Sequence, residues 1–315
     1  MRLATDTVED PIGDLSRFVE WTYPFVDGIR LRTCWNVVQP QSNTYNWSTI
    51  DQALSLAAQN GKRVGVSIAA GIATPQWVYD NGATKYQLLD GSGNSMPVPW
   101  EPPYYDQWLA FVRTFGTRYD TNPALAYVII TGFMQTNGMF LAEGVDEANL
   151  ASNAVQAGYP DLSTAYLFAA ESITSALMDA FPTTACILTL QPPFPDLDAL
   201  QGTVKHWGVA TYPGRFGTMN NGLVAVPAPH PSPPPPAPYP FGYQMTCSAT
   251  IDPARLYRDP DPVPMPPPPI PLQDALENGV SLGGQYVEVY KTDLELGIDW
   301  GVLAAEGVKL KANLP

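Results

Sequence analysis

The feature that most constrains the fold is the alternation of short β-branched runs with helical patterns along the chain. In the first repeat, predicted strands at residues 28–35 and 63–68 flank an apolar helical face that runs from Ile50 to Ala58. The helical stretch ends at Asn60-Gly61, a typical C-cap signal. Strands that alternate with helices in this way form βαβ units, in which the strands pair in parallel.

The same alternation continues towards the end of the chain. Further strands are predicted at residues 126–130, 186–190, 207–210, 241–247 and 286–290, and a short one at residues 2–5. Eight parallel strands with intervening helices close into a (β/α)₈ barrel, the TIM barrel, which takes about 250 residues plus insertions. We therefore expect an α/β protein with a single barrel domain over residues 1–315.

Two tracts, residues 226–240 and 259–271, are very rich in proline. Such segments can be polyproline ligands for SH3-like partners. Both tracts fall between predicted strands, however, which favours stiff loops. Because the loops that follow barrel strands build the C-terminal face, we expect long Pro-rich loops on that face.

Charge and composition exclude several classes of partner. The net charge of −14 gives no electrostatic reason to bind nucleic acid or an anionic membrane. The three cysteines lie far apart and the chain has only two histidines, so we expect no metal and no cofactor. No window reaches the roughly 18 apolar residues of a membrane span, and the N-terminus lacks the apolar run of a signal peptide. We expect a soluble protein, and an extracellular location stays open.

Two ordered segments carry a family resemblance. Arg32-Thr33-Cys34-Trp35 is followed by Tyr45-Asn46-Trp47, and Pro75-Gln76-Trp77 comes after the predicted strand at 63–68. In this order they resemble segments of clan-A glycoside hydrolases, particularly β-galactosidase-like members. The resemblance implies a carbohydrate partner, with Arg32, Trp35 and Trp77 at the sugar site. A flat aromatic side chain suits this role because its face packs against the C–H side of a pyranose.

The positions that should carry catalysis depart from the resembled pattern. The fourth strand of those families leads into Asn-Glu, where the Asn binds the sugar and the Glu is the acid/base, and the corresponding residues here are Asn137 and Gly138. The seventh strand should carry the nucleophilic Glu, and the best match is Gln244. A neutral amide cannot form a glycosyl ester. Tyr212, after the predicted strand at 207–210, is similar to a tyrosine that often touches the nucleophile, although a Tyr-Pro turn explains it equally well.

Glycoside hydrolysis usually requires two carboxyl groups, so other acids of this chain would have to supply them. Glu288 is the clearest candidate, because it shares one face of the last predicted strand with Tyr286 and Tyr290. Glu143, in the loop after Gly138, is a second candidate, with a solvated loop acid as the alternative.

Two hypotheses of different classes follow. The first is a carbohydrate-active hydrolase that uses Glu288 with Glu143 and binds sugar through the residues named above. The second is a catalytically inactive barrel that binds a glycan or serves in self-assembly, because Gly138 and Gln244 stand where carboxylates are expected.

Overall fold

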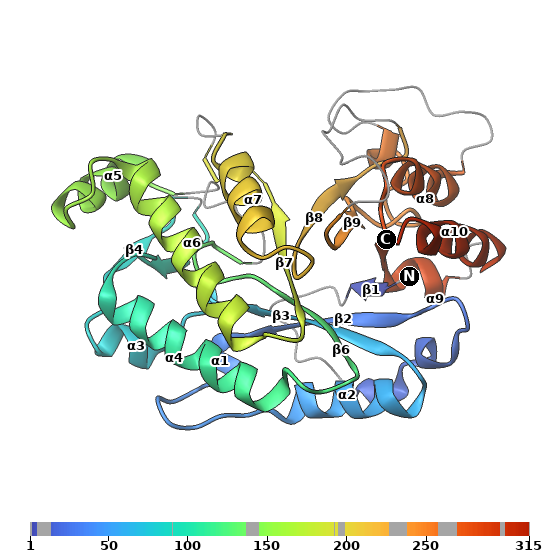
Figure 1. Ribbon diagram of the computed structural model, residues 1–315, viewed down its shortest axis with the longest axis horizontal. Helices are drawn as coiled ribbons and strands as arrows, with labels where there is room; N and C mark the ends of the chain where they lie inside the picture. The colour runs from blue at the N-terminus through green and yellow to red at the C-terminus, as the bar shows by residue number, and fades with distance from the viewer. Residues whose placement is uncertain are drawn as a thin grey trace.

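Eight parallel strands close into a barrel at the centre of the computed structural model (Figure 1). The structure describes residues 2–4, 14–89, 91–136, 145–191, 193–194, 199–226, 238–257, 270–296 and 300–314. In chain order the barrel strands are β1 (Arg2–Ala4), β2 (Gly28–Cys34), β3 (Arg63–Ala69), β6 (Leu125–Ile129), β7 (Ala185–Leu190), β8 (Phe216–Leu223), β9 (Phe241–Met245) and β10 (Tyr286–Tyr290). Each pairs with the next, and β1 closes the barrel between β2 and β10. The expected α/β barrel is confirmed.

Helices cover the outside of the barrel. Figure 1 shows α4 and α6 on one flank, α8 and α10 on the other, and α2 below the strands. The covering helices are α2 (Ser48–Gln59), α4 (Pro102–Tyr119), α6 (Leu162–Ala180), α7 (Ala199–Thr211), α8 (Pro271–Ser281) and α10 (Trp300–Ala312). Short elements after the strands are α1 (Trp35–Val38), α3 (Gln76–Asp80), α5 (Glu147–Gln156), α9 (Lys291–Glu295) and a hairpin of β4 (Lys85–Gln87) and β5 (Ser95–Pro97).

The main hydrophobic core lies between the strands and these helices. Alternate residues of a strand face outward, and in β3 the outward side chains Val64, Val66 and Ile68 are all buried in this core. The inward side chains form a separate, smaller apolar cluster around Tyr127, Ile187 and Met219. The barrel interior is therefore filled with side chains and is not a pore.

One strand assignment is wrong. Residues 207–210 belong to α7, where Leu200, Val204 and Gly208 recur every four residues on the buried face. The strand of this repeat is β8, and it was missed because its run Asn220-Asn221-Gly222 has a low β-propensity. Tyr212 consequently precedes β8 and lies at the N-terminal end of the barrel, opposite the expected site.

Most of both proline-rich tracts, at residues 227–237 and 258–269, lies outside the described residues. Their predicted place on the C-terminal face stays a prediction. Within the part of the chain that the structure describes, no helix is both long and apolar enough to cross a membrane.

Candidate carbohydrate site at the C-terminal mouth

Gln244 is the centre of a hydrogen-bonded network near the C-terminal end of β9. Its Oε1 accepts hydrogen bonds from Arg32 Nη2 at 2.7 Å and from Arg30 Nη1 at 3.2 Å. Its Nε2 lies 3.3 Å from the Tyr290 hydroxyl, to which it donates. Two arginines from β2 thus fix which way the amide points, because a guanidinium can only donate. The Gln244 side chain is positioned as a carboxylate would be, without its charge.

Glu288 lies beside Gln244, on the neighbouring strand β10. It pairs with Gln244 in the β9–β10 ladder and is completely buried. One carboxylate oxygen accepts from Arg30 Nη1 at 2.8 Å, and the other accepts from the Tyr127 hydroxyl. Burial alone would lower the pKa of Arg30, but Glu288, Tyr127 and Tyr286 together outweigh it and raise that pKa. Glu288 and Arg30 therefore form an ion pair that is buried in the barrel interior.

Further acceptor atoms lie at the C-terminal ends of other barrel strands. The side-chain oxygens of four residues are buried and have no hydrogen-bond partner among the residues that the structure describes. These residues are Gln135 after β6, Thr189 in β7, Gln191 after β7 and Asn221 in β8. Because all barrel strands run parallel, these positions share the C-terminal end with Gln244. Sequence analysis missed them, and the only sequence signal is a polar residue at the end of an otherwise apolar strand.

The two predicted tryptophans differ in accessibility. Trp35 is completely buried and packs edge-on against the rings of Trp77, Tyr104 and Trp108. Its indole N–H donates to Gln39 Oε1 at 2.8 Å, so the side chain has no free surface for a sugar. Trp77, in α3, is half-buried and donates to the Gln39 carbonyl at 3.1 Å. Of the two, only Trp77 exposes part of its ring.

The remaining predicted residues do not join this group. Asn137, Gly138 and Glu143 lie outside the described residues. Tyr212 is at the opposite end of the barrel, where Arg215 stacks over its ring. Arg30 and Tyr127, which complete the network, were not predicted. Arg30 could have been found from the period of two, since it shares the inward face of β2 with Arg32.

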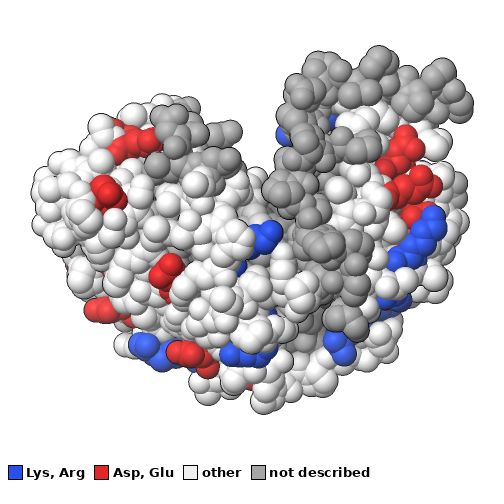
Figure 2. Space-filling view, turned by 45° about the horizontal axis from the view of Figure 1, so that its top comes forward, with Lys and Arg blue, Asp and Glu red and all other residues white. Residues whose placement is uncertain are grey.

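Figure 2 shows a basic side chain, and no acidic one, on the described surface directly below the notch in the upper outline of the molecule. Among the described residues no group of His, Cys, Asp and Glu could hold a metal ion. The described part of the mouth therefore offers amide and hydroxyl oxygens as acceptors, together with donors from Arg32 and Gln244. Such a set can orient a polyhydroxylated ligand, because every sugar hydroxyl both donates and accepts.

Comparisons with known proteins agree with this architecture. Residues 29–132 match a family model described as β-galactosidase. The solved β-galactosidase of a Rahnella species has a TM-score of 0.50 at 12% identity, over 93% of this chain and 52% of that one. The match over residues 29–132 is a similarity to that family, and the structural likeness shows the (β/α)₈ barrel fold.

Two further solved structures are similar. The catalytic domain of the major endoglucanase from Xanthomonas campestris has a TM-score of 0.47 at 13% identity, over 93% of this chain and 89% of that one. The β-galactosidase of Marinomonas has a TM-score of 0.45 at 14% identity, over 71% of this chain. The present chain spans only 40% of the Marinomonas enzyme's length. No curated protein sequence matches this chain.

Proposed function

We propose that this chain is a carbohydrate-active protein of glycoside hydrolase type that takes a glycan at the C-terminal mouth of its barrel. The observation that carries the proposal is the set of unpartnered acceptor oxygens at Gln135, Thr189, Gln191 and Asn221, at the same end of the barrel as the ordered amide of Gln244. Buried acceptors without donors are costly, and a bound ligand rich in hydroxyl groups would satisfy them. β-Galactosides are the first class to test, because the matching family model and the Rahnella structure carry that name.

In this proposal Arg32 and Gln244 hold sugar oxygens, and Trp77 contributes the exposed part of its ring. Asn137 would join them from the loop after β6, in keeping with the motif at that position. Trp35 acts through packing, since it supports Trp77 edge-on at a ring separation of 5.9 Å. Hydrolysis by Glu288 and Glu143 requires that Glu288 leave its ion pair with Arg30.

A second candidate is glycan binding without hydrolysis, and one observation favours it. Glu288 has no exposed surface and both of its oxygens are engaged, so it has no free position from which to attack or protonate a glycosidic bond. The neutral Gln244 cannot replace it as a nucleophile. Self-assembly, which the sequence left open for such a barrel, stays a prediction.

Two measurements on the full chain test the proposal. Titration calorimetry with lactose, a β-galactoside, should show binding that Gln244→Ala weakens by at least about tenfold, as expected for a lost hydrogen bond to charged partners. Gln59→Ala, at the exposed end of α2, is the matched control and should bind as the parent does. Equal affinities of Gln244→Ala and the parent for every glycan bound would remove the mouth as the site.

Release of nitrophenol from a nitrophenyl β-galactoside separates the two candidates. Turnover by the parent chain that is absent from a Gln244→Ala preparation supports a hydrolase. Glycan binding without any turnover supports the binding protein. Turnover that persists unchanged in Gln244→Ala would contradict a role of Gln244 in hydrolysis and also its role in binding the glycan.

A further inference from the structure

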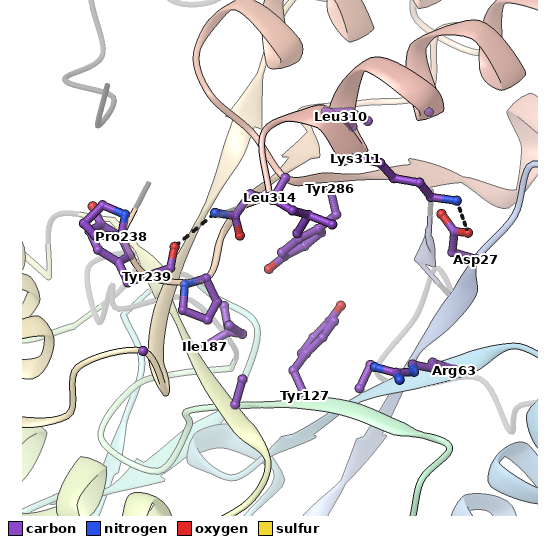
Figure 3. A pocket seen from close by; sticks show the side chains of 16 residues that line it. Asp27, Arg63, Tyr127, Ile187, Pro238, Tyr239, Tyr286, Leu310, Lys311 and Leu314 are labelled. Atoms are coloured by element: carbon purple, nitrogen blue, oxygen red, sulfur yellow. Dashed lines mark hydrogen bonds and ion pairs between the residues drawn. The ribbon is translucent and has the colours of Figure 1, made fainter. Parts of the chain in front are cut away.

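A cavity opens at the N-terminal end of the barrel, opposite the proposed glycan site. Its volume is about 430 Å³, which lies in the range of small-molecule pockets. It is bounded by the first residues of β3, β6 and β7, by the segment before β9, and by one face of α10. Figure 3 shows Tyr127, Tyr286 and Tyr239 around an open space with Arg63 and Lys311 at its edge.

Two tyrosines close this cavity towards the barrel interior. Tyr127 and Tyr286 stack with ring centroids 5.7 Å apart and an interplanar angle of 24°. Each ring lies over a glycine: a Cβ on Gly65 would come within 2.2 Å of the Tyr127 ring, and one on Gly242 within 2.3 Å of the Tyr286 ring. The two glycines therefore make the space in which the tyrosine floor forms. The floor separates the cavity from Gln244 and the mouth.

The rim of the cavity carries an excess of positive charge in a protein whose net charge is −14. The Arg63 guanidinium makes no hydrogen bond or ion pair with any other side chain that the structure describes. Lys311 in α10 forms an ion pair with Asp27 at 2.8 Å, so the charges of these two side chains cancel. Lys62 lies close enough to Asp27 and Lys311 to interact with both electrostatically. Beyond the tyrosine floor, the charges of Glu288 and Arg30 cancel each other.

The lining below this rim is mostly apolar and aromatic. Ile187, Pro240, Leu310 and Leu314 contribute aliphatic surface beside the tyrosine rings. The side chain of Gln285 is occupied, since it accepts from Phe241 N at 3.2 Å and donates to the Tyr239 carbonyl at 3.3 Å. An occupant therefore needs an apolar or aromatic body and a negative charge directed to the rim.

We propose that this cavity is a binding site for a small aromatic carboxylate, with the ring against Tyr127 and Tyr286 and the carboxylate at Arg63. The planar guanidinium of an arginine matches a carboxylate in two parallel hydrogen bonds. The site is not catalytic, because barrel chemistry takes place at the other end. It is separate from the glycan proposal, since Arg63 at its rim and Gln244 at the mouth lie at opposite ends of the barrel, although Tyr127 lines the cavity and its hydroxyl donates to Glu288 of the network.

The test uses 2-naphthoate and its neutral amide, 2-naphthamide, as probes of the full chain by titration calorimetry. The naphthoate should bind at one site, and Arg63→Gln should weaken it by about fivefold, as expected for a charge pair at a solvent-exposed rim. The amide should bind the parent more weakly than the acid. Arg113→Gln, which removes an exposed arginine from α4, is the matched control and should leave the affinity unchanged.

Three outcomes would overturn the proposal. The first is equal affinity of the parent and Arg63→Gln for naphthoate, and the second is equal affinity of the acid and the amide. The third is loss of naphthoate binding in Gln244→Ala, which would place the anion in the mouth. A circular dichroism spectrum like that of the parent shows that each variant has folded, so that weaker binding reports on the site.

Discussion

The two halves of the barrel interior are built in opposite ways. On the side of β6, β7 and β8, the inward residues Ile129, Ile187 and Met219 form an apolar cluster with Tyr127. On the side of β2, β9 and β10, Arg30, Gln244 and Glu288 form a hydrogen-bonded network. Charged and polar groups deep in a barrel are stabilised when their partners are buried beside them. Grouping them on one side meets this condition and brings the network to the mouth.

The largest expected effect comes from breaking the buried pair on the polar side. Glu288→Leu leaves Arg30 as an uncompensated charge with no exposed surface. We expect the free energy of unfolding to fall by about 3–5 kcal/mol. Urea denaturation followed by circular dichroism measures this change.

The double variant Arg30→Met/Glu288→Leu sharpens the test. It replaces both charges with apolar side chains, so it should recover most of the stability lost in Glu288→Leu. A double variant less stable than Glu288→Leu would show that apolar side chains cannot replace the ion pair on the polar side of the barrel.

Tyr127 joins the two halves, because its ring packs with the apolar cluster and its hydroxyl donates to Glu288. Tyr127→Phe keeps the ring and removes one donor from the carboxylate. We expect a loss of about 1.5–3 kcal/mol, the usual range for a hydrogen bond to a charged group. No loss in a urea titration would mean that water replaces the hydroxyl, and that the polar half is wetter than its contacts indicate.

The smallest effect is expected on the apolar side. Ile187→Val removes one methylene from a side chain that is 1% exposed. The expected cost is about 0.5–1.5 kcal/mol, from lost burial and a small cavity. Thermal unfolding at fixed pH measures it, and a cost equal to that of Tyr127→Phe would erase the proposed difference between the halves.

Periodicity was sufficient to predict most of this fold. Seven of the eight predicted strands overlap barrel strands, because their inward and outward residues alternate in runs of β-branched side chains. The strand β8 escaped because Asn220 and Asn221 weaken its pattern. The residue that it contributes to the mouth, Asn221, could not be predicted for the same reason.

The contacts of a side chain were harder to predict than the face of the strand on which it lies. The period of two correctly placed Glu288 on one face with Tyr286 and Tyr290, but it does not show that Arg30 reaches across β1 to pair with it. Similarly, the motif around Trp35 gives no indication that four aromatic rings enclose that side chain. Both depend on contacts between segments far apart in the sequence.

The stacked pair of Tyr127 and Tyr286 also matters for protein engineering. The two rings fill the barrel interior between the C-terminal mouth and the N-terminal cavity. Side chains at one end can therefore be redesigned without altering solvent access at the other end. Truncating both rings to alanine would remove this floor and extend the N-terminal cavity towards Glu288, which the Tyr127 hydroxyl contacts. The depth of that cavity could then be changed without altering Arg63 at its rim.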